Sequence, residues 1–183
     1  MKQMDKKIKR LDRKEVFNGK RVRLVIDKLK MPNDKEVNWE LITHPGAAAV
    51  IPVDNDGNII MVRQYRNAAD DYVLEIPAGG VEEGEDPSIC AKRELEEETG
   101  YKSDNIEYLL KFYSSIGITD EMISIYVATD LQESQQNLDD DEYVTIEKYK
   151  LEKLIDMIYS GQITDGKTIS GLLAYKCKLN DMK

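Results

Sequence analysis

The chain has 183 residues, a length that suits one ordinary domain with a small appendage. Its formal net charge of −9 and isoelectric point near 4.8 disfavour a general surface for nucleic acid or anionic membranes, because the long-range field repels polyanions. Cys90 and Cys177 lack a C-x-x-C or His-rich companion, so neither a disulfide scaffold nor a zinc site is expected. No stretch approaches a membrane span and no apolar region follows the basic N-terminus, which predicts a cytoplasmic protein.

The first part of the chain is predicted to form strands. Residues 13–30 and 36–44 alternate polar and apolar side chains around a cluster of turn formers, so we expect antiparallel strands there. Residues 47–53 and 59–64 flank an Asp-Asn-Asp-Gly turn and are expected to pair as a hairpin.

Later elements follow the same reasoning. Pro45-Gly46 is the expected boundary between an N-terminal β subdomain, residues 1–45, and a second domain, residues 46–183. The remaining predictions are strands at 106–113 and 122–128, a surface loop at 132–142, and helices at 151–160 and 168–179.

One helix is specified by its end signals. Asp86 can cap its amino end, Pro87 suits the first helical position, and Gly100 can adopt the left-handed conformation that ends a helix. These signals predict a helix over residues 87–99.

Three glutamates share one face of this helix. At about 100° per residue, Glu94, Glu97 and Glu98 fall within roughly a third of a turn, near the negative end of the helix dipole. A hard divalent cation with oxygen ligands would offset the repulsion among them. The alternative interpretation is a solvated acidic face on an acidic protein.

The glutamates belong to a longer spaced pattern. It consists of Gly79, Glu85, Arg93-Glu94-Leu95, Glu97-Glu98 and Gly100. This pattern resembles the Nudix box, with Tyr101 at the position where the family usually has an aliphatic residue. The resemblance implies an α/β/α sandwich in which the box forms a loop, a helix and a loop. It also implies hydrolysis of a nucleoside diphosphate linked to another moiety.

The resemblance further implies a metal centre. Glu94, Glu97, Glu98 and the carbonyl of Ala78 would bind Mg²⁺ or Mn²⁺, the number of ions being open, and Arg93 would orient a carboxylate by a bidentate contact.

Segments outside the box resemble the ADP-ribose pyrophosphatase branch of the family. They are Val62 to Arg66, Leu74 to Gly80, His44-Pro45-Gly46 and the stretch from Asp165 to Leu173, so that the resemblance covers roughly residues 15–180. It implies a nucleoside diphosphate sugar as substrate and a homodimer, in which N-terminal sheets are often exchanged. Ile116 stands where this branch usually has Pro, which leaves GDP-mannose, UDP-sugars and flavin or nicotinamide dinucleotides open as substrates.

Four residues are candidates for substrate binding. Arg63 and Arg66 either donate to phosphate oxygens or form surface ion pairs. Alternate positions of a strand face opposite sides, so the two arginines are expected to face opposite sides of the strand. Glu75 accepts from one of these arginines or reaches a metal-bound water. Trp39 either stacks on adenine, as the resemblance implies, or anchors a core or an interface.

Several acidic residues are candidates for the general base. Related enzymes use a glutamate at the point where Glu142 ends an acidic loop, and a loop carboxylate can approach when substrate closes the site. The alternatives are plain solvation of Glu142, replacement by Asp141, and Glu97 acting as base. His44, the only histidine, is expected to form strand-end hydrogen bonds, and no G-x-S-x-G elbow supports a Ser-His-Asp triad.

Two features of the sequence are compatible with functions other than hydrolysis. Residues 161–168 match the P-loop expression G-x-x-x-x-G-K-[ST], but they follow an amphipathic segment and leave only 15 residues after Thr168, so we interpret them as a connection between two helices. The second rival is a non-catalytic sensor that binds a nucleotide sugar on the same fold. A sensor that does not catalyse hydrolysis would not need the metal-binding glutamates and could lose them. Their presence in this sequence therefore argues against the sensor.

Overall fold

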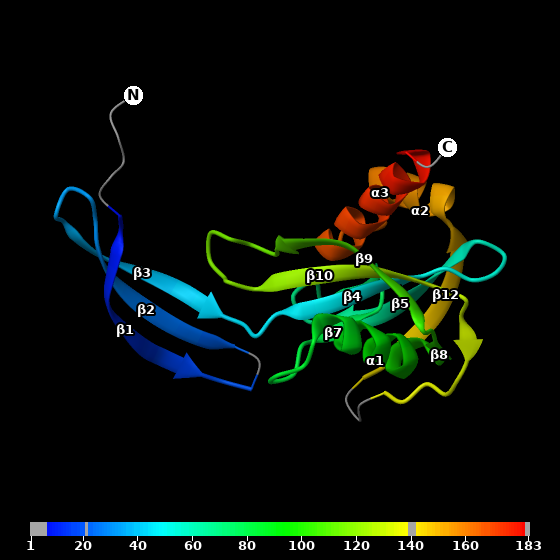
Figure 1. Cartoon of the computed structure of the whole chain (residues 1–183), viewed down its shortest axis with the longest axis horizontal. Helices are drawn as coiled ribbons and strands as arrows, with labels where there is room; N and C mark the ends of the chain where they lie inside the picture. Colours follow the sequence, from blue (N-terminus) through cyan, green and yellow to red (C-terminus); the bar gives the residue numbers. More distant parts are fainter. Residues whose placement is uncertain (1–6, 21, 139–141, 182–183) are drawn as a thin grey trace. The chain divides into compact units, whose positions relative to one another are not determined.

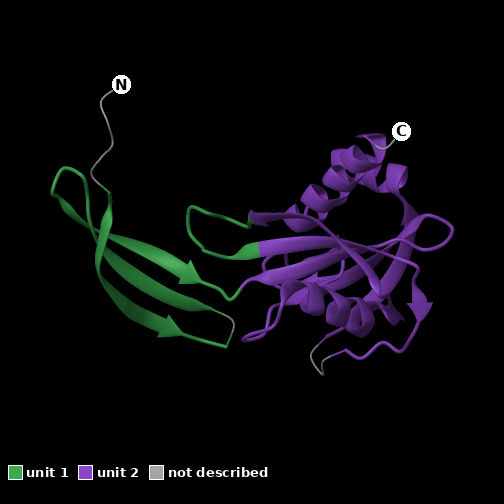
Figure 2. Ribbon diagram, viewed as in Figure 1, with its two compact units in different colours: residues 1–45, 113–122 green, residues 46–112, 123–183 purple. Residues whose placement is uncertain are grey.

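The computed structural model describes residues 7–20, 22–138 and 142–181. The chain forms two compact units, which Figure 2 shows in different colours. Unit 1 comprises residues 1–45 and 113–122, and unit 2 comprises residues 46–112 and 123–183. The second unit begins at Gly46, next to the predicted boundary, whereas the return of residues 113–122 to unit 1 has no signal in the sequence.

Unit 1 contains a three-stranded antiparallel sheet in the order β1-β2-β3. Its strands are β1 (Lys9–Asn18), β2 (Arg23–Lys30) and β3 (Glu36–Thr43). The prediction of one strand over 13–30 is therefore wrong, since the chain reverses at Gly19, whose amide donates to the carbonyl of Val22 at 2.8 Å. The Asn18-Gly19 pair is a known hairpin signal that could have located this turn.

The segment 113–122 extends the same unit beside the end of β3. The amide of Ile42 donates to the carbonyl of Ile118 at 2.9 Å, and the amide of Asp120 donates back to the carbonyl of Ile42 at 3.2 Å.

On the sheet itself, Val25 and Leu29 are buried on one strand with Asp27 between them. The carboxylate of Asp27 accepts two hydrogen bonds from Arg13, at 2.6 and 2.7 Å.

Unit 2 is an α/β/α sandwich, as Figure 1 shows, with α1 on one face of the sheets and α2 and α3 on the other. One sheet has the order β7-β4-β10-β9, a second has the order β12-β5-β6, and β11 pairs with β8. The strands are β4 (Ala47–Pro52), β5 (Asn58–Arg66), β6 (Asp71–Glu75), β7 (Ala78–Gly80), β8 (Tyr101–Lys102), β9 (Asn105–Tyr113), β10 (Met122–Thr129), β11 (Gln132–Glu133) and β12 (Val144–Lys150). The helices are α1 (Pro87–Thr99), α2 (Leu151–Tyr159) and α3 (Gly166–Asp181).

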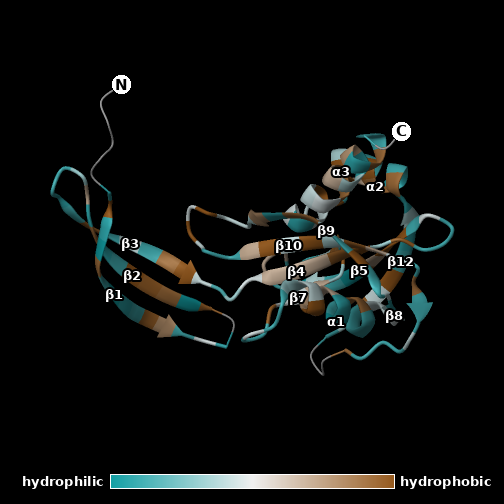
Figure 3. Ribbon diagram, viewed as in Figure 1, coloured by the Kyte–Doolittle hydropathy of each residue, from teal (hydrophilic) through white to brown (hydrophobic). Residues whose placement is uncertain are grey.

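The central strand β4 shows how the layers are held together. Ala48 and Val50 pack in the cluster that includes Leu95 of α1, whereas Ala49 and Ile51 pack in the cluster that includes Leu154 and Leu172 of α2 and α3. Alternate positions of a strand face opposite sides, so a strand buried on both sides is apolar throughout. Figure 3 shows this concentration of apolar residues in β4 and β10. The predicted α/β class is confirmed.

The predicted hairpin of residues 47–53 and 59–64 is wrong. The turn forms, since Gly57 donates to the carbonyl of Asp54 at 2.8 Å, but only Val53 and Ile59 form a bridge across it. Beyond that bridge, β4 pairs with β7 and β10, whereas β5 pairs with β6 and β12. A turn signal is local, and it does not determine which strands a fully buried strand takes as partners.

The segment 161–168 connects two helices, as predicted, and its last three residues form the start of α3. It follows α2, and Gly161 has a positive φ of 74° where that helix ends. The element directly before it is a helix and not a strand, so the context of a phosphate-binding P-loop is lacking. Within the described residues, no helix combines the length and apolar character needed to cross a membrane.

Candidate functional site

The site is built on α1, whose ends are those expected from the sequence. Asp86 is the N-cap, and its carboxylate accepts from the amide of Ser88 at 2.8 Å. Pro87 occupies the first helical position, and Gly100 follows the last one with φ 68°. These local signals fix where the helix begins and ends, and thereby which of its glutamates turn toward the sheet.

Glu94 lies against the backbone of Gly79 in the strand β7. A Cβ atom placed on Gly79 would lie 1.9 Å from Oε1 of Glu94, so any side chain at this position would displace the carboxylate. The neighbouring Gly80 has open space at the same point. The first glycine of the spaced pattern is thus required by the carboxylate that approaches it.

Arg93 connects the acidic residues of the helix and of the loop before it. Its guanidinium donates to both carboxylate oxygens of Glu85, at 3.1 and 3.2 Å, and to the carbonyl of Gly80 at 3.1 Å. Its Nη1 atom also donates to Glu94 at 2.5 Å and to Glu97 at 2.9 Å. These carboxylates raise the pKa of Arg93, and the hydrogen bonds that Arg93 donates to Glu85 are the largest cause. Two carboxylates of the site thus converge on one cationic nitrogen.

Glu98 is a buried carboxylate, only 2% exposed. It accepts from the amide of Ala78 at 3.0 Å and from the side chain of Gln64 at 3.3 Å. Burial, the largest cause, and the negative charges of Glu94 and Glu142 together raise the pKa of Glu98 to about 8. Burial also raises the pKa of Glu94, to which Glu97 and Glu142 add. The structure therefore brings Glu142 within electrostatic reach of both buried glutamates.

The metal-binding capacity of these residues rests on the chemistry of the donor set. Within the described ranges, no group of three or more His, Cys, Asp or Glu side chains is arranged to hold a metal ion, and Arg93 pairs with Glu94 and Glu97. The side chains of Glu94, Glu97 and Glu98 are nevertheless all carboxylates, and the buried Glu94 and Glu98 repel each other. Such a set fits a hard divalent ion.

The arginines of β5 point to opposite faces. Arg66 donates twice to Glu75, at 2.8 and 2.7 Å, and shares its face of the strand with Gln64, which bonds to Glu98. Arg63 lies on the other face and pairs with Glu147 at 2.5 Å. The structure therefore brings Arg66 and Glu75 beside the glutamates and separates Arg63 from them.

Other predicted residues lie elsewhere in the chain. Trp39 lies on β3 of unit 1 with 52% of its surface exposed, and its role stays a prediction. The amide of His44 donates to Asp120 at 2.8 Å, and its Nδ1 lies 3.5 Å from Glu121, which agrees with a strand-end hydrogen-bonding residue. Asp141 lies outside the described residues.

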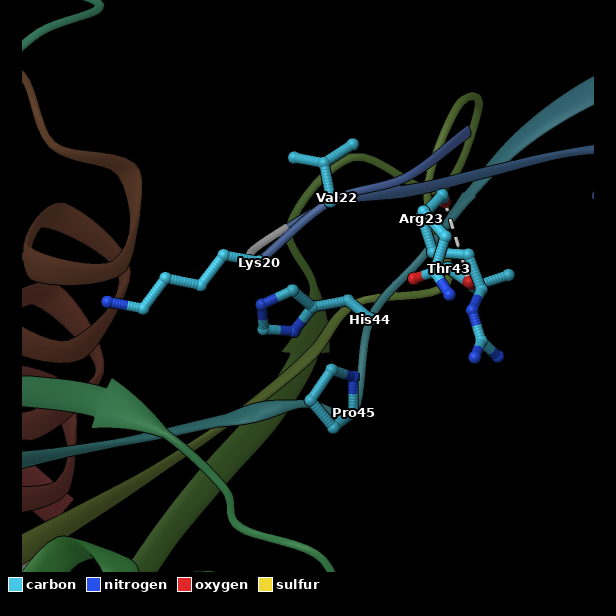
Figure 4. A pocket seen from close by; sticks show the side chains of 8 residues that line it. Lys20, Val22, Arg23, Thr43, His44 and Pro45 are labelled. Atoms are coloured by element: carbon cyan, nitrogen blue, oxygen red, sulfur yellow. Dashed lines mark hydrogen bonds between the residues drawn. The ribbon is translucent and has the colours of Figure 1, made fainter. Parts of the chain in front are cut away.

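A pocket of about 390 Å³ lies in unit 1 beside His44 (Figure 4). Its other linings include Lys20, Arg23 and Pro45, so it is basic at its edge. The side chain of Thr43 donates to the carbonyl of Arg23 at 3.5 Å within it. None of the glutamates of α1 lines this pocket.

Sequence reasoning missed the residues that hold the carboxyl end of α1. The amide of Asn137 donates to the carbonyl of Glu97 at 3.0 Å, and the side chain of Gln136 donates to the carbonyl of Glu98 at 2.7 Å. The last carbonyls of a helix have no partners inside the helix, so they need donors from elsewhere. A polar loop after a helix is a general signal for such donors. Gln64 and Lys167 were also missed, although Gln64 lies two residues before Arg66 and therefore on the same face.

Comparisons with known proteins place the chain in a family. A model of the NUDIX domain matches residues 43–170. A methanol dehydrogenase activator of Bacillus methanolicus is 41% identical over 163 residues, with 88% of each chain covered. An ADP-ribose pyrophosphatase of Bacillus subtilis (strain 168) is 38% identical over 162 residues, which cover 87% of this chain and 88% of the relative.

A solved structure shares the fold. A crystal structure of an ADP compounds hydrolase superposes with a TM-score of 0.85 at 22% identity, covering 97% of this chain and 96% of that chain. The family match extends over more than half of the chain and includes every glutamate of the α1 site. The chain therefore belongs to the Nudix family, and it is a Nudix hydrolase similar to the ADP-ribose pyrophosphatases of that family.

Proposed function

We propose that the chain hydrolyses the pyrophosphate bond of ADP-ribose, or of a related nucleoside diphosphate sugar, to a nucleoside monophosphate and a sugar phosphate. The observation that carries this proposal is the pair of buried carboxylates, Glu94 and Glu98, beside Glu97 on one helix. Burying like charges together is unfavourable in an isolated protein, and a bound cation would compensate for it. The 38% identical ADP-ribose pyrophosphatase supports the choice of substrate class.

In this proposal Glu94, Glu97, Glu98 and the carbonyl of Ala78 hold Mg²⁺ or Mn²⁺. The metal would neutralise charge on the diphosphate and lower the pKa of the attacking water. Arg93 orients the glutamates through the hydrogen bonds that it donates to Glu94 and Glu97.

The remaining residues act on protons and on the phosphate. Glu142, which interacts electrostatically with Glu94 and Glu98, takes the proton of the attacking water, and Glu97 is the alternative base. Arg66 donates hydrogen bonds to a phosphate oxygen, since its side chain remains 38% exposed beside the buried Glu75. We leave Arg63 out of the site because it faces the opposite side of β5.

We also propose a homodimer formed through unit 1. Val16 and Phe17 of β1 are 50% and 56% exposed, and Trp39 is exposed on β3, which suits a surface that a second copy covers. Trp39 then stacks on the base of the substrate. Light scattering coupled to gel filtration tests the dimer, and a monomer at micromolar concentration would contradict it.

The function is tested with a panel of ADP-ribose, GDP-mannose, UDP-glucose, NAD⁺ and FAD, with nucleoside monophosphate as the measured product. We expect turnover of ADP-ribose with Mg²⁺ and none with EDTA. Binding without product in both conditions would favour the non-catalytic sensor instead.

A second candidate is activation of a methanol dehydrogenase, favoured by the 41% identical activator from Bacillus methanolicus. Adding the chain to a methanol dehydrogenase assay tests it. The variant Glu97→Gln distinguishes two routes: activation that survives this change depends on binding, whereas activation that is lost depends on hydrolysis.

A further inference from the structure

Glu75 is a buried carboxylate held by two cations. It is 1% exposed, and Arg66 donates to both of its oxygens at 2.8 and 2.7 Å. The Nζ atom of Lys167 donates to Oε2, the same oxygen that accepts from Nη2 of Arg66. Lys167 also lies 3.1 Å from the carboxylate of Asp165. The sequence places Lys167 in a connection between helices and in a segment resembling the pyrophosphatase branch, but it indicates no role for its side chain.

The two cations differ in their access to solvent. The side chain of Arg66 is 38% exposed, whereas that of Lys167 is 11% exposed. Arg66 also shares a face of β5 with Gln64, which bonds to Glu98. Arg66 can therefore meet a ligand at the glutamate site, whereas Lys167 is enclosed.

Lys167 has a fixed position because the start of α3 is tied to the end of β6. The carboxylate of Asp165 accepts from the amide of Thr168 at 2.9 Å and from its hydroxyl at 2.6 Å. The same hydroxyl accepts from the amide of Ile76 at 2.9 Å. Thr168 is fully buried, so this junction places the lysine beside Glu75 before any ligand arrives.

A guanidinium that turns from a buried carboxylate to a phosphate leaves the carboxylate without a counter-ion, which is strongly unfavourable. We propose that Lys167 is a positioning residue that neutralises Glu75 while Arg66 donates to the diphosphate, an inference that rests on the proposed function. Glu75 then keeps a cationic partner and stays aligned throughout, and Arg66 can bind the substrate. The lysine itself does not contact the substrate.

The variant Lys167→Met keeps most of the apolar stem and removes the charge. We expect the KM for ADP-ribose and the Kd for α,β-methylene-ADP, measured by calorimetry in Mg²⁺, to rise about tenfold, with kcat within about twofold. Lys167→Arg should restore binding. The matched control is Lys178→Met on the same helix, which removes an ion pair with Glu107 and should leave both constants unchanged.

The same change in a Glu75→Gln background completes the test. With no carboxylate to hold Arg66, Lys167→Met should alter the Kd by less than about twofold. An equal loss in both backgrounds would mean that Lys167 contacts the ligand directly, and a lower Tm without any change in Kd would mean a purely structural role. Either result overturns the proposal, as does a wild-type protein that does not bind α,β-methylene-ADP. Because the analogue is not hydrolysed, the binding cycle decides the role of Lys167 even if ADP-ribose is not turned over.

Discussion

Gly79 and Glu94 lie so close together that the glycine has no room for a side chain: a Cβ atom on Gly79 would be 1.9 Å from Oε1 of the glutamate. Gly79→Ala should therefore displace the carboxylate. We expect a loss of at least about a hundredfold in kcat/KM and a fall of about 1–3 kcal/mol in the free energy of unfolding.

The adjacent glycine provides the control for this prediction. Gly80→Ala meets nothing within 4 Å and should leave kcat/KM within about twofold of the wild type. Steady-state kinetics and urea unfolding of both variants measure the difference. Equal effects of the two changes would contradict the role given to Glu94.

Glu97→Gln should abolish turnover with little effect on folding. Glu97 is the most exposed of the three glutamates, with a side chain 35% exposed, so its charge contributes little to stability. Glu96→Gln is the control, because that carboxylate turns away and accepts from Ser134. A Glu97→Gln enzyme with a near wild-type rate, measured as nucleoside monophosphate released, would refute the assignment of the site.

Glu98→Gln should make the metal-free protein more stable while it removes activity. Burial and the charge of Glu94 raise the pKa of Glu98 to about 8, so an ionised Glu98 is unfavourable at pH 9. We expect a rise in Tm of a few degrees in EDTA at pH 9, equivalent to about 1–2 kcal/mol. Added Mg²⁺ should raise the Tm of the wild type and leave that of the variant unchanged. A variant that melts lower than the wild type in EDTA would contradict this expectation.

Asp27→Asn should destabilise unit 1 in a pH-dependent manner. Hydrogen bonds from Arg13 lower the pKa of Asp27 below its ordinary 3.8. A carboxyl group with a lowered folded pKa contributes stability above its unfolded pKa, and that contribution is lost as the pH falls through the folded value. We expect the variant to be about 1–2 kcal/mol less stable at pH 7, and the difference to shrink below pH 3.8.

Urea unfolding at several pH values, followed by the fluorescence of Trp39 in the same sheet, measures this difference. Glu36→Gln is the control, because it removes an ion pair with Lys28 that is exposed on both sides and should have little effect. A stability difference for Asp27→Asn that does not change with pH would show that the ion pair is not its cause.

The helix of the site could be predicted from the sequence because its signals are local. Asp86, Pro87 and Gly100 each act within one turn of the backbone, and the 3.6-residue period places the glutamates on one face without reference to the rest of the fold. The same holds for Gly161 at the end of α2. The pairing of β4 could not be predicted in this way, because its partners β7 and β10 come from distant parts of the chain.

The contacts of Glu75 could not be predicted from the sequence either. Lys167 is 92 residues away from Glu75 in the sequence, and only the docking of α3 on the end of β6 brings them together. Arg63 and Arg66 illustrate a different limit. Strand alternation predicts that they face opposite sides, but only the contacts of Gln64 with Glu98 and of Arg66 with Glu75 show which side carries the site.

The position of Arg93 has a consequence for how the protein matures. Because its guanidinium already donates to Glu85, Glu94 and Glu97, the acidic helix carries an internal counter-ion. Under the proposed function, the chain could therefore fold before a divalent ion binds, unlike small zinc domains whose folding waits for the ion.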